Sequence, residues 1–460
     1  MSSLSPLKKW AQQRPSCLAL KSLEKNYTWV ELADDVDCMA AGLSSQGIKA
    51  GEVLACVGQN SVDNVLAYLA CMELGAICAL IMPQTQVDLE AKLATLYPEK
   101  AQANIGCIQL NWPLSLYANI DLDLRSERGF TAAYHQDKPA SIIFTSGSTG
   151  RPKAVVHTSR QHLASASGLL ETLPFTQRDT WLLSLPIYHV SGLAIIYRWL
   201  LTGAALKLAN GDWQDDLIGV THASFVATQL QRVLDSKVLQ DLSHVLLGGS
   251  HIPLSLSQQA SKRGIETWVG YGMTEAASTV TAKKVDGSEG VGQVLAKRNL
   301  MLKDKRIHIS GETLALGYYE QGQIVPLKQH SWFDTKDLGL WKNGELHIIG
   351  RVDNLFISGG ENIHCEEIEA VLHQVPNIIQ AIVVPVEDKE FGHRPVAVIK
   401  SGFSLDIEEI EKSLSGELVK FKWPIAYYEM PEHLSRQAIK VSRSAVNHWV
   451  RQHRSSAAPL

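Results

Sequence analysis

The chain has 460 residues, which is more than a single hydrophobic core supports, so we expect at least two domains. Hydrophobic residues make up 45% of the chain and charged residues 20%, a composition that excludes an intrinsically disordered protein. The formal net charge of −4 provides no overall basic field, so we expect no nucleic-acid partner.

The cysteines and the N-terminal residues indicate in which cellular compartment the protein is expected. The 7 cysteines are scattered and form neither a CxxC pair nor a Cys/His metal motif, which is typical of reduced thiols. The N-terminus has no apolar signal core, and no stretch approaches the roughly 20 apolar residues of a membrane span. We therefore expect a cytoplasmic protein without a membrane span. The sequence leaves both a monomer and a homo-oligomer open.

Apolar strand-like runs alternate with helical stretches over the first 290 residues or so, which predicts layers of helices and parallel-rich sheets. Segments 53–60 and 76–83 are predicted strands, and 61–75 between them is a predicted helix. Segment 180–209 predicts a strand, a loop, a helix, a glycine turn and a strand. Further strands followed by loops are predicted within 222–234, 242–253 and 265–275. In an open parallel sheet the loops that follow the strands carry the functional residues.

The pattern changes after about residue 290, where shorter strands with tight turns are predicted over 306–311 and 341–350. Asn343 and Gly344 predict a hairpin turn. The last hundred or so residues predict a helix over 364–375, strands over 378–386 and 394–400, and a helix over 406–418. We place a domain boundary at Val352–Asn354. The predicted fold class is α/β, with an N-terminal domain over 1–352 and a small α+β C-terminal domain over 353–460.

One loop carries the first chemical signal. The segment "TSGSTGRPK" (145–153) follows a predicted buried strand. Its Gly, Ser and Thr residues can approach a phosphate closely and donate hydrogen bonds, and Lys153 adds a positive charge. The loop lacks the GxxxxGK[ST] pattern of a P-loop, and Pro152 argues against a helix directly behind it. An ordinary surface loop is the alternative, but the composition after a buried strand favours phosphate binding.

The segment "TSGSTGRPK" resembles the phosphate loop of the adenylate-forming superfamily, which includes acyl-CoA synthetases, nonribosomal adenylation domains and luciferases. Five further motifs resemble that family in its own order: "LPIYHVSGL" (185–193), "YGMTE" (271–275), "FDTKDLG" (333–339), "GRVDNLFISGGENIHCEEIE" (350–369) and "IKVSR" (439–443). The resemblance implies a large N-terminal domain and a small mobile C-terminal domain, with the hinge at Asp353. It also implies ATP, Mg²⁺ and coenzyme A as ligands.

The resemblance assigns nucleotide-binding roles residue by residue. It implies that the β- and γ-phosphates are held by Thr145, Ser146, Gly147, Ser148, Thr149, Gly150 and Lys153. It implies that Thr274 contacts the α-phosphate and that Glu275 holds Mg²⁺ through a carboxylate oxygen. It places adenine between Tyr271, with Gly272 beside it, and the wall formed by Gly249, Ser250 and His251. It gives the ribose to Asp337 and Arg351. Taken alone, Tyr271 could be a core aromatic residue, Asp337 a turn former and Glu275 a helix N-terminal acid.

The last motif resembles the C-terminal lysine motif of the family, and this implies that Lys440 is the catalytic lysine, whose ammonium would stabilise the adenylation transition state. The family's usual Pro–Thr–Gly run before this lysine is missing, since the chain has "LSRQAIK". Lys420 and Lys422 are competitors, and a surface lysine beside Arg443 is the structural alternative. The implied catalytic residues are Lys440, His189, Thr274 and Glu275. The implied pantetheine channel is lined by Ser358, Gly359 and Gly360.

The acid pocket is predicted from two stretches that offer neutral donors and one cation but no acidic residue. Such a composition suits an acid with a second anionic or carbonyl group. Arg198 lies in an apolar helical run, and a structural ion pair or an extended side chain reaching the surface is its alternative role. The predicted substrate residues are His189, Ser191, Gly192, Arg198, Ser278 and Thr279.

The segments "IYHVSGLAIIYRWLLTGA", "GYGMTEAASTV", "DNLFISGGENI" and "DKEFGHRPVAV" resemble the o-succinylbenzoate–CoA ligases of menaquinone biosynthesis. The resemblance implies a small-molecule aromatic carboxylic acid as substrate. No carrier or condensation domain is evident, which favours a standalone CoA ligase. Other aryl or short-chain acid–CoA ligases, a standalone adenylation enzyme and a non-catalytic ATP-binding regulator remain as alternatives.

Overall fold

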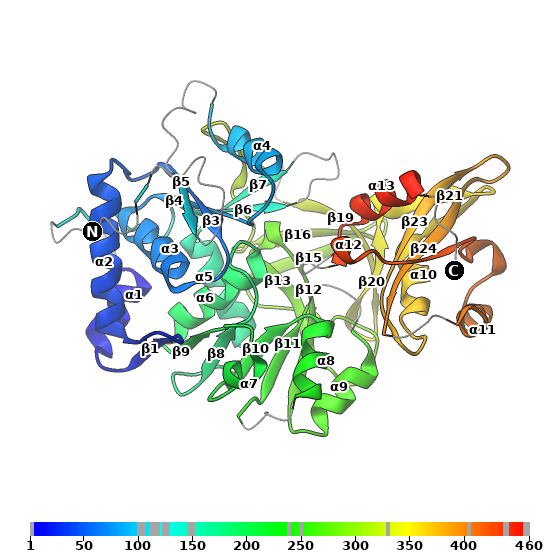
Figure 1. Cartoon of the computed structure of the whole chain (residues 1–460), viewed down its shortest axis with the longest axis horizontal. Coiled ribbons are helices and arrows are strands. Elements are labelled where there is room, and N and C mark those ends of the chain that lie inside the picture. The colour runs from blue at the N-terminus through cyan, green and yellow to red at the C-terminus, as the bar shows by residue number, and fades with distance from the viewer. Residues whose placement is uncertain are drawn as a thin grey trace.

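The computed structural model describes residues 4–98, 107–110, 120–121, 129–145, 152–236, 241–248, 252–327, 332–402, 406–435 and 441–453. Figure 1 shows a large lobe that carries the N-terminus and a smaller lobe, coloured orange and red, formed by the C-terminal part of the chain. Within these ranges, no helix combines the length and apolar character that crossing a membrane requires.

The first sheet of the large lobe has seven strands, and it carries the predicted phosphate loop. Strands β5, β3, β4 and β6 pair in parallel, whereas β7 is antiparallel to β6 and β17 is antiparallel to β7. The sheet order is β18 (Gln323–Pro326), β17 (Gly317–Glu320), β7 (Lys153–Thr158), β6 (Pro139–Thr145), β4 (Ile77–Ile81), β3 (Val53–Gly58) and β5 (Cys107–Leu110). The strands predicted over 53–60 and 76–83 are confirmed as β3 and β4. As Pro152 indicated, a strand and not a helix follows the loop.

The second sheet of the large lobe has nine strands. Within it, the neighbouring strands β1, β9, β8, β10, β11 and β12 pair in parallel. Its order is β14 (Gln293–Val294), β13 (Ser278–Lys284), β12 (Glu266–Met273), β11 (His244–Leu247), β10 (His222–Phe225), β8 (Thr180–Leu183), β9 (Ala205–Leu208), β1 (Leu18–Lys21) and β2 (Asn26–Thr28). The strands predicted near residues 180, 205, 222, 244 and 266 are confirmed.

Helices pack between and around these two sheets. They are α1 (Pro6–Gln13), α2 (Trp29–Ser45), α3 (Val62–Leu74), α4 (Gln86–Leu96), α5 (Ser159–Leu170), α6 (Val190–Thr202), α7 (Trp213–Asp216), α8 (Ala227–Asp235) and α9 (Leu254–Ser261). Local sequence sets their ends: Thr28 and Glu31 form a capping box at the start of α2, and left-handed Gly203 ends α6. The stacked rings of Trp29 and Trp199, 5.0 Å apart, lie in the largest core.

A four-stranded antiparallel sheet follows, in the order β15 (Arg298–Lys303), β16 (Arg306–Gly311), β19 (Phe333–Lys342) and β20 (Glu345–Arg351). The hairpin predicted at Asn343 and Gly344 is confirmed. Both residues have positive φ angles, 54° and 79°, as a two-residue hairpin turn requires. The short 3₁₀ helix η3 (Val352–Asn354) leads from this sheet into the small lobe.

The small lobe is a five-stranded sheet covered by helices. Its strands are β22 (Glu361–His364), β21 (Leu355–Ser358), β24 (Gly392–Ser401), β23 (Ile378–Asp388) and β25 (Tyr427–Glu429). Its helices are α10 (Cys365–Leu372), α11 (Ile407–Glu417), η4 (Lys420–Lys422), α12 (Glu432–Ser435) and α13 (Arg443–His453). The helices and strands predicted from residue 364 onward are confirmed, and so is the fold class: a large α/β N-terminal part with a smaller C-terminal domain.

Candidate active site

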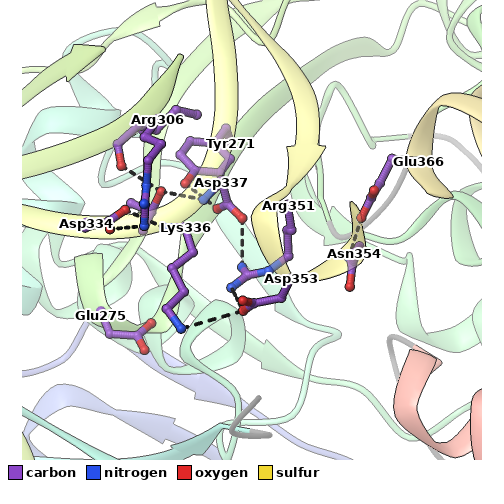
Figure 2. A network of polar contacts seen from close by, with 12 residues as sticks. Tyr271, Glu275, Arg306, Asp334, Lys336, Asp337, Arg351, Asp353, Asn354 and Glu366 are labelled. Atoms are coloured by element: carbon purple, nitrogen blue, oxygen red, sulfur yellow. Dashed lines mark hydrogen bonds and ion pairs between the residues drawn. The ribbon is translucent and has the colours of Figure 1, made fainter. Parts of the chain in front are cut away.

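Three predicted nucleotide-binding residues form one hydrogen-bonded group. The Tyr271 hydroxyl at the end of β12 donates to Asp337 Oδ2 over 2.6 Å, and Arg351 Nη1 lies 2.7 Å from Asp337 Oδ1 (Figure 2). Burial raises the pKa of Tyr271 well above its usual value, and the Asp337 carboxylate adds to the shift, so the phenol stays protonated. Asp337 itself is only 6% exposed. It is therefore a buried acceptor in a strand and not a turn former.

The predicted hinge residue, Asp353, continues this group. Its Oδ2 lies 3.9 Å from Arg351 Nη2 and 3.8 Å from the ammonium of Lys336, which Figure 2 shows reaching toward Asp353 from β19. Lys336 has a φ of 62°, a backbone conformation that normally favours glycine. The Asp334 carboxylate accepts the backbone N–H of Lys336 over 3.0 Å and so supports that conformation.

Lys153 and Glu275 are brought together by a residue that the sequence patterns did not single out. Thr145 and Lys153 are paired partners in β6 and β7, so the two ends of the phosphate loop lie opposite each other. The Lys153 ammonium lies over the ring of Tyr318, 5.1 Å from its centroid. The Tyr318 hydroxyl donates to Glu275 Oε1 over 3.0 Å. Tyr318 thus lies between the predicted phosphate-binding lysine and the predicted metal ligand.

Glu275 and Thr274 lie on the short 3₁₀ helix η2 (Thr274–Ala276), between β12 and β13. Gly272, just before it, has no room for a side chain, because an added Cβ would lie 2.1 Å from the Ser278 carbonyl oxygen. Ser278 and Thr279 begin β13, so these two predicted acid-pocket residues lie close in the chain to the predicted metal ligand.

The chemistry of Glu275 fits Mg²⁺. Across the part of the chain that the structure describes, no cluster of three or more Asp, Glu, His or Cys residues could cage a metal. Mg²⁺ in nucleotide enzymes commonly takes one or two carboxylates and completes its shell with phosphate and water oxygens. A single carboxylate, 8% exposed and close to the end of the phosphate loop, suits that mode of binding.

His189 precedes α6, and Ser191 and Gly192 lie in the first turn of that helix. Burial lowers the pKa of His189 to about 4, and the nearby Lys92 ammonium contributes, so the imidazole is neutral at neutral pH. Gly192 is needed for packing, because an added Cβ would lie 2.1 Å from the Pro186 carbonyl oxygen.

Arg198 lies further along α6 and is 2% exposed, which rules out an extended side chain reaching the surface. It donates to Ser224 Oγ over 3.3 Å and its guanidinium lies 4.9 Å from the centre of the Trp181 ring. Its Nε is buried and has no hydrogen-bond partner among the described residues. Within the described ranges, no carboxylate comes within ion-pair distance, so the alternative of a structural ion pair is not found. Burial lowers the pKa of Arg198 to about 9, and the charge of Arg298 contributes.

In the small lobe, Ser358 ends β21, and Gly359 and Gly360 form the turn to β22 with φ angles of 57° and 90°. The Ser358 hydroxyl is buried, and no residue in the described part of the chain forms a hydrogen bond with it. Arg443, at the start of α13, pairs with Glu366 and Glu369 of α10. These contacts fix the chain just after the predicted catalytic lysine.

Nine of the predicted site residues lie outside the described residues: Ser146, Gly147, Ser148, Thr149, Gly150, Gly249, Ser250, His251 and Lys440.

Models of known protein families match most of the chain. The AMP-binding enzyme model matches residues 7–319, and the AMP-binding enzyme C-terminal domain model matches residues 367–452. The chain belongs to the AMP-binding enzyme family. This membership confirms the family expected from the sequence motifs.

Two curated relatives of this AMP-binding enzyme are similar over nearly their whole length. The 2-succinylbenzoate–CoA ligase of Salmonella typhimurium is 40% identical over 456 residues, which covers 97% of both chains. The 2-succinylbenzoate–CoA ligase of Haemophilus influenzae is 44% identical over 434 residues, which covers 92% of both.

Solved structures of similar enzymes contain bound ligands. An Escherichia coli MenE variant with bound OSB-AMS has a TM-score of 0.88 and 38% identity, covering 98% of this chain and 99% of that one. The o-succinylbenzoate CoA synthetase (MenE) of Bacillus subtilis with ATP and magnesium has a TM-score of 0.81 and 25% identity, covering 94% and 96%. A double mutant of the Bacillus subtilis enzyme with the product analogue OSB-NCoA has a TM-score of 0.68 and 25% identity, covering 97% and 98%.

Sequence patterns missed two residues at the centre of this AMP-binding enzyme. Tyr318 lies in a short aromatic strand that no predicted motif includes, and only its pairing with β7 reveals its position. Lys336 lies inside "FDTKDLG" beside the predicted ribose aspartate. A lysine within that otherwise acidic motif was the available signal.

Proposed function

We propose that this chain is an ATP-dependent acid–CoA ligase that acts on 2-succinylbenzoate in menaquinone biosynthesis. The curated relatives named for this activity cover nearly the whole chain, and that observation carries the proposal. ATP, Mg²⁺ and coenzyme A are the implied ligands, and an aromatic carboxylic acid is the implied partner.

In the first step, a carboxylate oxygen of the acid attacks the α-phosphorus of ATP. A new C–O–P linkage forms, the bond to the β-phosphate oxygen breaks, and pyrophosphate leaves. Lys153 and the loop it closes would neutralise the β- and γ-phosphates, and Thr274 would donate to the α-phosphate. Glu275 would hold Mg²⁺, which neutralises phosphate charge when bound, and Tyr318 would fix the Glu275 carboxylate. Asp337, oriented by Tyr271 and Arg351, would accept hydrogen bonds from the ribose hydroxyls.

In the second step, the sulfur of coenzyme A attacks the acyl carbon of the adenylate. A thioester forms, the acyl C–O bond breaks, AMP leaves, and the thiol proton is released. The turn at Ser358, Gly359 and Gly360 would admit the pantetheine arm, because its glycines carry no side chains. Rotation of the small domain about Asp353 would move Lys440 away from the active site and bring this turn to it.

A small hollow in the small lobe suits the nucleotide end of coenzyme A. It is lined by Ser358, Phe391, Arg394, Lys420 and Phe421. The Arg394 guanidinium lies 5.0 Å from the centre of the Phe391 ring. Aromatic faces for a base and two cations for phosphates lie next to the proposed pantetheine turn, so we propose that the nucleotide binds here.

Arg198 supports a dianionic acid as the substrate. A buried guanidinium without a carboxylate partner is costly, and an anionic ligand would offset that cost. With Arg198→Gln, we expect the KM for 2-succinylbenzoate to rise at least tenfold, since a charged hydrogen bond contributes about 1.5–3 kcal/mol. The KM for ATP should stay within about twofold, and kinetics with both substrates varied would measure the difference. An equal rise in both constants would contradict this role.

The test of the function is pyrophosphate release over a panel of acids, with and without coenzyme A. We expect release with 2-succinylbenzoate, and thioester only when coenzyme A is present. Activity on benzoate or fatty acids but not on 2-succinylbenzoate would indicate an acid–CoA ligase with another substrate. Adenylation without thioester formation would indicate a standalone adenylation enzyme. No release with any acid would leave a non-catalytic ATP-binding protein.

Lys440 is tested by separating the half-reactions. Lys440→Ala should reduce pyrophosphate release by a factor of about a hundred or more, because a transition-state charge contact is lost. Thioester formation from supplied acyl-adenylate should be much less affected. Lys420→Ala and Lys422→Ala are the matched controls, and equal loss of both half-reactions in Lys440→Ala would contradict the proposed role.

The remaining parts of the proposal concern organisation. We place the boundary at Asp353, with domains over 1–352 and 353–460. It is supported by the hydrophobic clusters, each of which, among the described residues, draws its members from one side of Asn354. We also propose a cytoplasmic enzyme that binds no nucleic acid, and gel filtration would decide between a monomer and a homo-oligomer.

A further inference from the structure

The turn that follows Glu275 is strained. Ala277 and Ser278 are consecutive non-glycine residues with positive φ angles, 52° and 100°. Such conformations are unfavourable for residues that carry a Cβ and persist only where the surroundings hold them. Both residues are buried, with Ala277 at 0% and Ser278 at 8% exposure. The turn joins the short helix that carries Glu275 to the strand that carries Ser278 and Thr279, so its geometry sets where these side chains lie.

A buried serine holds this turn. Ser165 Oγ, on α5, donates its single proton to the Ala277 carbonyl oxygen over 2.5 Å. Ser165 Oγ itself accepts a hydrogen bond from Arg298 Nη2 over 2.9 Å, and this nitrogen also donates to the Ser165 carbonyl oxygen over 2.8 Å. Because the guanidinium can only donate, the hydroxyl proton of Ser165 is directed to Ala277.

Arg298 is itself an unusual residue to bury. It is 6% exposed, and its Nη1 donates to the Ala296 carbonyl oxygen over 2.8 Å. In the described part of the chain no carboxylate lies within ion-pair distance of it. The packing is built around it, since a Cβ added at Gly168 of α5 would lie 2.3 Å from Arg298 Nη1. A buried charge is weak evidence for a purely stabilising role, because a protein with apolar residues of similar volume in its place is often at least as stable.

We propose that Arg298 is a positioning residue that acts through Ser165 to hold the turn at Ala277 and Ser278. It thereby fixes Glu275 toward the metal and phosphates and Ser278 toward the acid. This role rests on the proposed function, because it requires that Glu275 and Ser278 serve the adenylation step.

The test compares Ser165→Ala with Ser167→Ala, a matched change two residues along the same helix. For Ser165→Ala we expect a roughly tenfold rise in the Mg²⁺ concentration for half-maximal pyrophosphate release, with a similar rise in the KM for 2-succinylbenzoate. A tenfold change corresponds to about 1.4 kcal/mol, which is the size expected for the loss of one hydrogen bond. The KM for coenzyme A, measured with supplied acyl-adenylate, should not change. Ser167→Ala should leave all three constants unchanged.

Substitutions of the arginine test the same chain of contacts. Arg298→Gln should show the same shifts, and Arg298→Lys should recover part of them because it keeps a donor for Ser165. If these variants fail to fold, Ser165→Ala decides. Normal Mg²⁺ and acid constants in folded Ser165→Ala would overturn the proposal, because a purely structural residue lowers Tm and yield without moving these constants. A wild-type chain that releases no pyrophosphate would instead refute the proposed function.

Discussion

At the scale of single residues, Tyr318 connects two functional groups that lie far apart in the sequence. Its ring faces the Lys153 ammonium and its hydroxyl donates to Glu275. Burial raises the pKa of Tyr318, and the Glu275 carboxylate adds to the shift, so the hydroxyl remains a donor. One side chain therefore orients the carboxylate and limits the movement of the ammonium.

Removing only the hydroxyl tests this connection. With Tyr318→Phe, we expect the Mg²⁺ concentration for half-maximal pyrophosphate release to rise about five- to tenfold, since a hydrogen bond to a charged group is lost. The ring contact with Lys153 remains, so the KM for ATP should change less. Magnesium titrations of the initial rate would measure both. Tyr319→Phe, on the opposite face of β17 in the core, is the control, and matching behaviour of the two variants would contradict the role.

At the scale of elements, the segment from β19 through η3 holds the proposed hinge with weak contacts. Both ion pairs of Asp353 involve side chains that are 33–47% exposed. Exposed pairs contribute about 0–1 kcal/mol each and weaken with salt. Contacts of this strength stabilise one orientation of the hinge without preventing rotation.

Lys336→Gly removes the ammonium and keeps the left-handed backbone. We expect a two- to fivefold change in the ratio of thioester formation to adenylation at low salt, which corresponds to the loss of one such pair. The wild-type ratio should change in the same direction as salt rises to 0.5 M, whereas the variant ratio should change less. Lys342→Ala, on the same strand, should behave like the wild type. A salt response of Lys336→Gly identical to the wild type would contradict a hinge contact.

The elements also explain which features the sequence could predict. Strands β3 and β4, the helix α3 between them and the turn at Asn343 follow from local periodicity and turn chemistry, which neighbouring residues determine. The pairing of β17 with β7 could not be predicted, because it joins segments that are remote in the chain. Tyr318 was missed for that reason. The motif positions Tyr271, Asp337 and Arg351 were predicted together, whereas the burial of Arg198, with no carboxylate partner among the described residues, depends on tertiary packing.

At the scale of the whole molecule, buried histidines make the stability of the large lobe depend on pH. Burial lowers the pKa of His157 to about 3 and the pKa of His189 and His222 to about 4. The pKa of His162 is also well below 6.5, through burial and then the neighbouring His157. These groups are neutral when folded, whereas in the unfolded chain they take up protons near pH 6.5.

The unfolded chain therefore binds more protons than the folded chain between about pH 6.5 and pH 4, so stability falls as the pH falls through this window. Each histidine contributes a slope of up to about 1.4 kcal/mol per pH unit. Urea unfolding at pH 7, 6, 5 and 4.5 should show this decline. His162→Gln should reduce the slope by the contribution of one histidine, whereas substitution of the exposed His448 by Gln should leave the slope unchanged. Stability that is constant over this range would contradict the expectation.

The late pairing of β17 with β7 has a consequence for the order in which the protein is made. Until β17 emerges from the ribosome, β7 is the unprotected edge of its sheet, with backbone groups free to pair with another chain. The strand that ends the predicted phosphate loop would then be prone to aggregate in the nascent chain. The strand that brings Tyr318 to Glu275 also closes that edge, so the contact between these two residues and the protection from misassembly arise in a single folding event.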